Sequence, residues 1–438
     1  MNSEEVFKRY DVRGKFPEEL DEEFALRMGK ALGTLCTEDF SQRVVVCKDS
    51  KKTSTVLKEK LVEGLTSTGV NVVDIGTGPT DFAAFCGVDH GAVSVQVTSS
   101  HMPLEFNGFK FMYPEGNSFT NSDLNRLKNV FRNKKFNQGS GDIKSLEKVM
   151  RRRYRHRARI KAAHIGSQDL DKKIVFDSMG GATDVFIPQL LRDLGAEVVE
   201  LSKGREDVYR NPPNPKPGML DELKEKVEEE DADLGLAADL DGDRLTVYRD
   251  GFLRGEDVFA LLAKAVGGDT VASIDTAEVV EKVVEDRGGK TFYTRVGDPF
   301  VLEKVLEEDA DVAGEPNGHY AVKDFVPYNS AVLTGLIVAG LDIDERLSEL
   351  PDYSVERFSV EVEDKEKVMR GLKSDIRQLF GVESDVDGVK FSTQGFSVLV
   401  RPSGSSEKVR GVVSGESSEG IDEVISEVRS LISENGNG

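Results

Sequence analysis

The stretch KIVFDSMGGATDVFIPQLLRDLGAEVVE, residues 173–200, decides the fold class of this chain. The apolar run IVF near its start is typical of a buried strand, and the loop SMGGAT then turns the chain. DVFIPQLLRDLG follows with apolar residues at helical spacing, and EVVEL is a second apolar strand. A strand, a helix and a strand in this order predict one unit of an α/β layer fold.

The same alternation continues on both sides of this unit. Further strands are expected at residues 44–49, 71–76, 92–98, 234–239 and 245–250. From Gly255 a third block again alternates helices with strands and ends in the strand ADVAGE. The order of elements in the three blocks is similar enough to indicate a repeated architecture, although no repeat is visible residue by residue.

After Leu350 and Pro351 the pattern changes to β-α-β-β-α, in which residues 390–401 are expected to form a single strand. That order is typical of a small α+β domain. We therefore predict three α/β domains followed by a smaller α+β domain. The predicted boundaries are residues 1–150, 151–253, 254–351 and 352–438.

Composition excludes several classes of function. The chain has 438 residues and a formal net charge of −21, which argues against a broad nucleic-acid footprint because that binding depends on clustered positive charge. The opening MNSEEVFKRYDVRG has no apolar core, and no window approaches 18 apolar residues, so we expect neither a secretion signal nor a membrane span. Cys36, Cys47 and Cys86 are widely spaced and odd in number, which favours reduced, mostly buried thiols in a cytoplasmic protein.

One strongly basic cluster interrupts this acidic chain. Its members are Arg151, Arg152, Arg153, Arg155, Arg157, Arg159 and Lys161. One interpretation is a patch that binds anions or nucleic acid, and the other is a domain-linking helix whose charged face pairs with acidic neighbours. The second is favoured, because the run offers no regular series of aromatic residues on which bases could stack.

Two polar loops at predicted strand ends could carry chemistry. In the first, Ser100 and His101 follow a strand, with Lys110 nearby, an arrangement suited to nucleophilic or phosphoryl chemistry or simply to a polar turn. In the second, Asp239, Asp241 and Asp243 can converge on one hard cation such as Mg²⁺ or Ca²⁺, and a solvated acidic turn is the alternative. An EF-hand is excluded, because an arginine holds the obligatory glycine position and strands flank the loop.

Two further loops resemble ligand-binding turns. In GEPNGH, residues 314–319, Glu315 and Asn317 could bind sugar hydroxyls and His319 could shuttle a proton. In RPSGSS, residues 401–406, an arginine, several hydroxyls and backbone N–H groups could cradle an anion. Taken alone, GEPNGH is better explained as a plain turn, and RPSGSS is explained equally well as a plain turn or as a phosphate cradle. A hydroxyl nucleophile, a metal loop, a polyol loop and a phosphate cradle together indicate phosphoryl transfer on a phosphosugar.

These motifs resemble those of the α-D-phosphohexomutase family, most closely its phosphomannomutase/phosphoglucomutase branch. The resemblance covers essentially the whole chain. It is carried by YDVRG at 10–14, KDSKKTS at 48–54, TSSHMP at 98–103, NGFK at 107–110, DLDGDR at 239–244, VGD at 296–298, GEPNGH at 314–319 and RPSGSSEKVR at 401–410.

The resemblance implies three related α/β domains with mixed sheets around a central cleft, plus the small C-terminal α+β domain. It also implies that Ser100 is the phosphorylated serine, that Asp239, Asp241 and Asp243 hold Mg²⁺ with a phosphoserine oxygen, and that Arg13, His101 and Lys110 assist the serine. Substrate would be bound by Arg244, Gly297, Asp298, Glu315, Asn317, His319, Arg401, Ser403, Gly404, Ser405 and Arg410.

The implied activity is reversible transfer of a phosphoryl group between C1 and C6 of mannose or glucose phosphate, through a hexose 1,6-bisphosphate. A phosphoglucosamine mutase is the alternative within the family, although YDVRG leans toward mannose or glucose. A non-catalytic sugar-phosphate-binding protein and a metal-dependent phosphohydrolase are alternatives from other classes. The implied partner is a small phosphosugar, with no nucleic acid or membrane, and the protein is expected to be a monomer or a homodimer.

The chain departs from the usual family pattern at several positions. They are Met102, Leu240, Asn317, Ser406 with Glu407, and Asn329 with Ser330, where an acidic residue and a glycine are often found. The charged motif residues lead to one further prediction, a basic cleft inside an acidic shell that focuses anionic substrate. These basic residues are Arg13, Lys110, Arg244, Arg401, Lys408 and Arg410.

Overall fold

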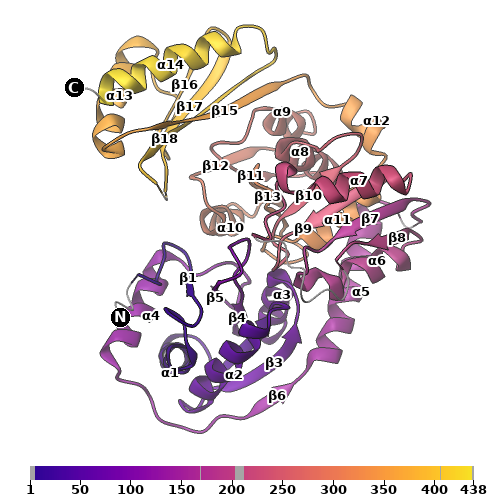
Figure 1. The fold of residues 1–438 in the computed structure, drawn as a ribbon, viewed down its shortest axis with the longest axis vertical. Helices are drawn as coiled ribbons and strands as arrows, with labels where there is room; N and C mark the ends of the chain where they lie inside the picture. Colours follow the sequence, from indigo (N-terminus) through magenta and orange to yellow (C-terminus); the bar gives the residue numbers. More distant parts are fainter. Residues whose placement is uncertain (1–4, 168, 203–211, 405, 437–438) are drawn as a thin grey trace.

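The computed structural model describes residues 5–167, 169–202, 212–404 and 406–436. Its first sheet has six strands in the order β1-β5-β4-β2-β3-β6 (Figure 1). Strands β2, β3, β4 and β6 are parallel, and β1 and β5 run antiparallel to their neighbours. The strands are β1 Val12–Lys15, β2 Arg43–Lys48, β3 Asn71–Thr77, β4 Val93–Val97, β5 Phe106–Met112 and β6 Ile143–Ser145.

Helices of the first domain pack on this sheet, and one pair is unusually close. The helices are α1 Glu22–Asp39, α2 Lys52–Thr66, α3 Thr80–His90 and α4 Asn121–Asn133. Where α1 crosses α2, a Cβ placed on Gly29 would lie 2.1 Å from the carbonyl oxygen of Leu61. Only glycine fits there, so this crossing depends on Gly29 and on the facing Gly64.

The second and third sheets repeat the topology of the first. The second has the order β10-β9-β7-β8 and the third β12-β11-β13-β14, each with three parallel strands and one antiparallel edge strand. Counted along the chain, the second and third sheets place the fourth strand beside the third, then the first, then the second. The inner four strands of the first sheet, β5-β4-β2-β3, have the same order, with β1 and β6 added at the edges. The expected repeated architecture and mixed sheets are therefore confirmed.

The elements of these two domains follow the predicted order. The second contains β7 Lys173–Asp177, α6 Ile187–Asp193, β8 Glu197–Glu200, α7 Asp221–Glu229, β9 Leu234–Ala238 and β10 Leu245–Tyr248, with short 3₁₀ turns at Ala182–Val185 and Pro217–Met219. The third contains α8 Gly255–Val266, β11 Thr270–Ser273, α9 Val279–Glu285, β12 Thr291–Thr294, α10 Asp298–Glu307, β13 Val312–Gly314, β14 Tyr320–Val322, α11 Ala331–Ala339 and α12 Ile343–Ser348.

The C-terminal domain is an antiparallel sheet in the order β15-β18-β17-β16, covered by two helices. Its elements are β15 Ser354–Glu361, α13 Lys365–Leu379, β16 Val389–Thr393, β17 Phe396–Pro402, β18 Lys408–Gly415 and α14 Ile421–Gly436. The prediction of a single strand over residues 390–401 was wrong. Gln394 and Gly395, with φ of 50° and 83°, form a tight turn that splits it into the hairpin of β16 and β17.

The basic cluster lies on α5, Glu147–Ile165, which runs from the first domain to the second (Figure 1). Arg153 forms an ion pair with Asp89 at 2.6 Å, and Lys161 with Asp324 at 3.4 Å. Arg155 donates to the carbonyl oxygen of Val185 at 2.6 Å. The interpretation as a linking helix with acidic partners is therefore confirmed. The helix crosses residues 150 and 151, so the predicted boundary falls within it.

One apolar core joins the first three domains. It runs from one face of the first sheet through α3 and α5 into the second and third sheets. The three cysteines are buried and form no disulfide, as predicted. Among the described residues no helix has the length and apolarity that a bilayer crossing requires.

Candidate active site

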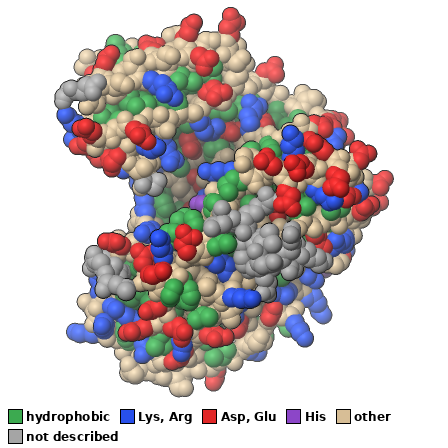
Figure 2. Space-filling view, in the orientation of Figure 1, with side chains coloured by type: hydrophobic (Ala, Val, Ile, Leu, Met, Phe, Trp, Pro, Cys, Tyr) green, Lys and Arg blue, Asp and Glu red, His purple; other side chains and the backbone are tan. Residues whose placement is uncertain are grey.

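A cleft of about 780 Å³ collects side chains from all four domains. Ser100 comes from the first, Arg244 from the second, His319 from the third and Arg401 from the fourth. Figure 2 shows the corresponding hollow below the C-terminal domain, with basic side chains along its walls. The basic residues lining it are Lys8, Arg9, Arg13, Lys110, Arg244, Arg401 and Arg410, and the acidic ones are Asp11, Asp243 and Asp298. The cleft is therefore basic, as predicted, within a chain of net charge −21.

Ser100 lies just past the end of β4, in a constrained loop. Its φ of 50° is in the left-handed region, and its N–H donates to Thr98 Oγ1 at 2.8 Å. From the loop's other side Lys51 Nζ donates to the carbonyl oxygens of Leu104 and Phe106 at 2.7 and 2.6 Å. Strained backbone held by buried contacts is typical of functional loops. These contacts hold the loop's backbone in place where Ser100 lines the cleft.

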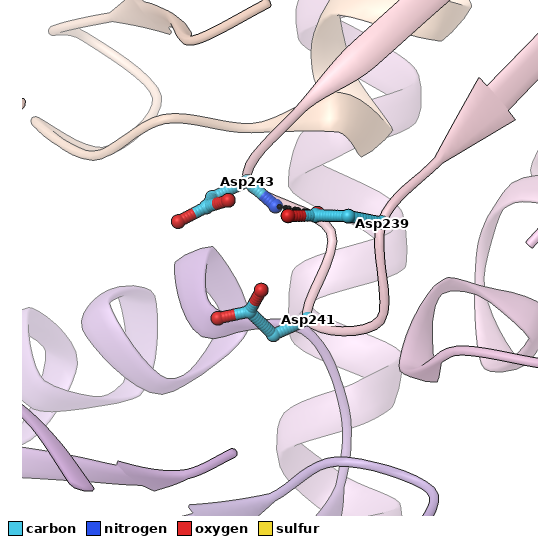
Figure 3. A group of neighbouring side chains, drawn as sticks. All are labelled: Asp239, Asp241 and Asp243. Carbon is cyan, nitrogen blue, oxygen red and sulfur yellow. Dashed lines mark hydrogen bonds between the residues drawn. The ribbon is translucent and has the colours of Figure 1, made fainter. Parts of the chain in front are cut away.

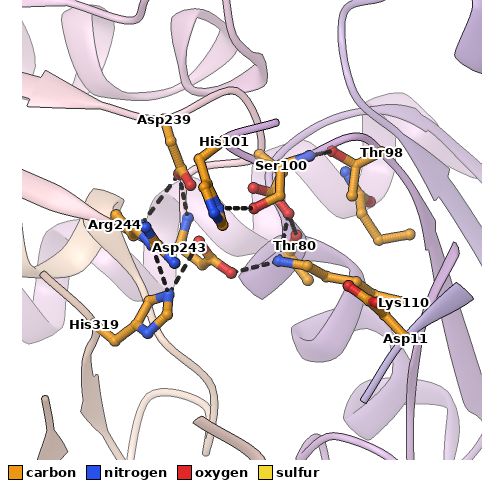
Figure 4. Close-up of polar contacts among 12 residues, drawn as sticks. Asp11, Thr80, Thr98, Ser100, His101, Lys110, Asp239, Asp243, Arg244 and His319 are labelled. Carbon is orange, nitrogen blue, oxygen red and sulfur yellow. Dashed lines mark hydrogen bonds and ion pairs between the residues drawn. The ribbon is translucent and has the colours of Figure 1, made fainter. Parts of the chain in front are cut away.

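His101 lies beside that hydroxyl. Its Nδ1 is 3.2 Å from Ser100 Oγ (Figure 4). Burial, together with the nearby Arg244 and Arg13, lowers the pKa of His101 to about 2. The imidazole is therefore neutral at ordinary pH, so a ring nitrogen without a proton can accept a hydrogen bond from Ser100 and the ring carries no positive charge.

The acidic loop between β9 and β10 brings its three carboxylates together. Asp239, Asp241 and Asp243 are buried, and one oxygen from each lies within 4.8 Å of the others (Figure 3). Asp239 Oδ1 accepts hydrogen bonds from the backbone N–H groups of Asp243 and Arg244 at 3.1 and 3.2 Å. The loop thus turns around its first aspartate, and Asp243 at its end lines the cleft.

The donor set of this loop fits a divalent cation. Asp239 Oδ2 and Asp241 Oδ1 are buried, and neither accepts a hydrogen bond from any residue in the described part of the chain. Burial and the two neighbouring carboxylates raise the pKa of Asp239 well above its ordinary value. Three convergent carboxylates with oxygens still open are the hard ligands that Mg²⁺ takes.

Lys110 on β5 joins this group from the first domain. Its Nζ lies 2.7 Å from Asp241 Oδ2 and 2.5 Å from Asp243 Oδ2. Burial disfavours its charged form, but the two aspartates outweigh burial and raise the pKa of Lys110 well above its usual range. A permanent positive charge therefore lies beside the carboxylates on the serine side of the cleft.

His319 and Arg244 connect the acidic loop to the third domain. His319 Nδ1 is 3.0 Å from Glu315 Oε2, and its Nε2 is 3.1 Å from Arg244 Nε and 3.5 Å from Asp243 Oδ1. Burial opposes a charged imidazole, but Asp243 and Glu315 raise the pKa of His319 above its ordinary value. Glu315 Oε1 in turn accepts from the N–H of Gly297 at 2.8 Å, which ties the predicted sugar loop to the 296–298 turn.

The structure does not bring every predicted substrate residue to the cleft wall. Glu315 is buried behind His319, and Asn317 is exposed, so neither lines the cleft. Ser403 is buried as well and contacts Ser406, whereas Ser405 lies outside the described residues. The remaining substrate positions that line the cleft are Arg244, Gly297, Asp298, His319, Arg401, Gly404 and Arg410.

Sequence reasoning missed several residues that the cleft contains. Asp11 pairs with Arg13 at 2.5 Å, and Arg9 stacks over the rings of Tyr10 and Phe300 while it faces the cleft. The KRYD run at residues 8–11 carries these charges beside an aromatic ring, a signal that could have identified them. Lys408 lies outside this cleft and lines a separate pocket of about 460 Å³.

The cleft brings together Ser100, the acidic loop and Arg401, and three sheets of related topology surround it. This combination is typical of an enzyme that transfers phosphoryl groups on phosphosugars. Models of the phosphoglucomutase/phosphomannomutase family match the chain, with α/β/α domain I at residues 4–138, domain II at 154–251 and domain III at 254–358. The chain therefore belongs to this family of phosphohexomutases, which are isomerases that transfer a phosphoryl group within a hexose phosphate.

Similar proteins carry more than one sugar in their names. A protein of Methanothermobacter thermautotrophicus named "Probable phosphoglucosamine mutase" is 31% identical over 430 residues, covering 94% of both chains. The "Phosphoglucomutase/phosphomannomutase" of Thermococcus kodakarensis is 31% identical over 436 residues, covering 92% of this chain and 93% of that one. A solved family member from Burkholderia thailandensis has a TM-score of 0.88 and 25% identity, covering 99% of this chain and 98% of its own. The preference for mannose or glucose stays a prediction.

Proposed function

We propose that this protein interconverts the 1-phosphate and 6-phosphate of a hexose through phosphorylated Ser100. The phosphoserine gives its phosphoryl group to the free hydroxyl of a hexose monophosphate, so the Ser100 Oγ–P bond breaks, a sugar O–P bond forms, and the hydroxyl proton is released. The resulting 1,6-bisphosphate turns around in the cleft. Its other phosphoryl group then passes to Ser100, and the sugar oxygen that it leaves takes up a proton.

The observation that carries this proposal is the composition of the single cleft described above. Ser100, the acidic loop and Lys110 lie together, and Arg401, Gly404 and Arg410 of the C-terminal domain line the same cleft. An arginine cradle that holds the phosphate not undergoing transfer can accept either end of the sugar. One serine can then serve both C1 and C6.

The side chains around Ser100 suit phosphoryl transfer. Mg²⁺ held by Asp239, Asp241 and Asp243 would offset the negative charge of the transferring group. Lys110 keeps its proton beside the carboxylates and adds a second positive charge on the serine side. Neutral His101 accepts from the Ser100 hydroxyl and orients its oxygen between transfers.

Asp298 favours an amino sugar over mannose or glucose as the substrate. Its carboxylate lines the cleft at the start of α10, and it forms no ion pair with any other residue that the structure describes. Burial raises its pKa to about 6 against the opposing charges of His319 and Lys110, so at neutral pH the group is largely a carboxylate, and it lacks a directly paired cation among the described residues. A 2-ammonium group of a glucosamine phosphate would supply that partner, whereas a 2-hydroxyl supplies only a hydrogen bond.

The test is a side-by-side assay of glucosamine, glucose and mannose 1-phosphates with Mg²⁺ and a trace of the matching bisphosphate. We expect 6-phosphate to form in the wild type and none in Ser100→Ala, with glucosamine 1-phosphate giving the highest kcat/KM. In Asp298→Asn the preference for the amino sugar should fall about tenfold. Turnover by Ser100→Ala would refute the mechanism, release of inorganic phosphate would indicate a phosphohydrolase, and bisphosphate binding without turnover would indicate a non-catalytic binding protein.

A further inference from the structure

A buried carboxylate outside the proposed chemistry lies at the junction of the first three domains. Asp81 is in the first turn of α3 and is completely buried. Its Oδ2 accepts hydrogen bonds from Ser330 Oγ at 2.5 Å and from the hydroxyl of Tyr154 on the linking helix α5. The two hydroxyl donors come from different parts of the chain, one from the third domain and one from the linker. Asp81 therefore joins three structural units at one atom.

The residues next to Asp81 and Ser330 both hold the acidic loop. On one side, Thr80 donates from Oγ1 to Asp241 Oδ2 at 2.8 Å and from its backbone N–H to the Asp241 carbonyl oxygen at 2.8 Å (Figure 4). On the other side, the N–H of Ala331 donates to the carbonyl oxygen of Gly242 at 3.0 Å. The loop of the second domain is thus gripped between the start of α3 and the start of α11.

The Asp81–Ser330 hydrogen bond closes these contacts into a ring. Starting at Asp81, the ring passes through Thr80 to Asp241 and Gly242, then through Ala331 to Ser330 and back. Ser330 is itself fixed, because its Oγ accepts from the N–H of Leu333 and caps α11 at 2.9 Å. Every contact in the ring is buried, so its parts cannot exchange partners with water.

The acidic loop needs such support from outside its own domain. Three carboxylates within 4.8 Å repel one another, and the loop's backbone includes a left-handed glycine, Gly242, with φ of 67°. A Cβ on that glycine would lie 2.4 Å from Thr183 and 2.9 Å from Pro79. Contacts from two other domains therefore fix where the Asp241 carboxylate points.

We propose that Asp81 is a positioning residue for the metal site, acting through Thr80 and Ser330 on Asp241. This inference rests on the proposed function, because it assumes that the acidic loop binds a divalent cation. It also explains the departure at Asn329 and Ser330. Ser330 donates its hydrogen bond to Asp81 on α3 of the first domain, so it does not need an acidic residue next to it in its own segment.

The experiment is titration of the full chain with Mn²⁺, followed by calorimetry, together with the Mg²⁺ concentration that gives half-maximal mutase activity. We expect Asp81→Ala and Ser330→Ala to weaken Mn²⁺ binding about tenfold. Removing a residue that orients a metal ligand typically lowers metal affinity about 10- to 100-fold, and these residues act on Asp241 indirectly. At saturating Mg²⁺ the KM for hexose phosphate should stay at the wild-type value, which general loosening of the cleft would not allow.

Two further variants separate positioning from packing. Asp81→Asn keeps a carbonyl oxygen that can accept from both hydroxyls, so it should restore Mn²⁺ binding to within about twofold of the wild type. Tyr154→Phe removes the hydroxyl donor outside the ring and should lower the thermal midpoint while metal affinity stays the same. Where Asp81→Ala does not fold, Ser330→Ala carries the test.

Folded Asp81→Ala or Ser330→Ala protein with wild-type Mn²⁺ affinity would overturn the inference. So would an equal loss of affinity in Tyr154→Phe, because that variant leaves the ring intact. Failure of the proposed function looks different: the wild type itself would then neither bind Mn²⁺ nor interconvert hexose phosphates.

Discussion

Replacement of Lys110 by methionine tests how the acidic loop is neutralised. The Lys110 side chain is 13% exposed, and its partners Asp241 and Asp243 are 0% and 2% exposed. Lys110→Met keeps most of the apolar stem and removes the charge, so it leaves buried Asp241 without an ion-pair partner among the described residues, whereas Asp243 keeps His319. Breaking a buried ion pair in this way costs about 3–5 kcal/mol.

That cost predicts a large effect on thermal unfolding. At an unfolding entropy of about 2.1 cal/mol/K per residue, a unit of roughly 350 residues shifts by about 1.4 °C per kcal/mol, so the metal-free variant should unfold roughly 4–7 °C below the metal-free wild type. Mg²⁺ at 100 times its Kd stabilises the folded state by about 2.7 kcal/mol. The gain in midpoint should be larger in Lys110→Met than in the wild type, where Mg²⁺ competes with the ammonium for the same oxygens.

The assay is differential scanning calorimetry of both proteins in chelator and in Mg²⁺. Lys60→Met is the matched control, since Lys60 forms an exposed ion pair with Glu63 at 2.9 Å, and its midpoint should hardly change. A metal-free Lys110→Met midpoint equal to that of the wild type would refute the reasoning. An equal Mg²⁺ effect in both proteins would refute the competition between metal and lysine.

Three other predictions follow from the same contacts. Gly29→Ala should lower the thermal midpoint, because the added Cβ separates α1 from α2. Gly218→Ala is the control, since a Cβ there meets nothing within 4 Å, and its midpoint should equal that of the wild type. Equal midpoints for the two variants would contradict the close crossing. Burial raises the pKa of Asp81 from 3.8 to about 7, so the folded protein binds a proton there more tightly than the unfolded chain does. The free energy of unfolding of the wild type, relative to that of Asp81→Asn, should therefore fall as the pH rises from about 4 to 7 in chelator and should stay level above that. A difference that does not change with pH would contradict this. Arg410→Ala should raise the KM for hexose phosphate at least tenfold with little change in metal affinity, and an unchanged KM would remove Arg410 from the phosphate cradle.

Most of the fold could be predicted because its signals are local. Apolar runs predict the strands within residues 173–200, and similar alternation of apolar strands and amphipathic helices recurs in each of the first three domains. Ser100 and the acidic loop each follow a predicted strand directly, so the place of each at the carboxyl end of a strand in its own sheet could be expected. The hairpin at Gln394 and Gly395 was missed because residues 390–393 and 396–401 are both strand-like, and we did not predict a turn at the single Gly395 between them. The positive φ values of both residues mark the turn in the structure.

The contacts between domains could not be predicted in the same way. Asp81 and Ser330 are 249 residues apart, and neither hydrophobic periodicity nor motif spacing connects them. Asn317 and Glu315 were expected to contact sugar because of their chemistry alone. Of the described residues in that loop only His319 lines the cleft, because the Glu315 carboxylate is occupied by hydrogen bonds with the Gly297 N–H and the His319 imidazole. Such outcomes depend on which side chains the domain junctions bury.

The central claim is that Ser100 carries the phosphoryl group that moves between C1 and C6. The most direct measurement is phosphosite mapping by mass spectrometry after incubation with hexose 1,6-bisphosphate and Mg²⁺, followed by a chase with unlabelled hexose 1-phosphate. We expect one phosphoryl group on Ser100 after the first step and, in the chase, its transfer to hexose 1-phosphate to give the 1,6-bisphosphate. A phosphoryl group on another residue, or a Ser100 phosphate that the sugar cannot remove, would contradict it.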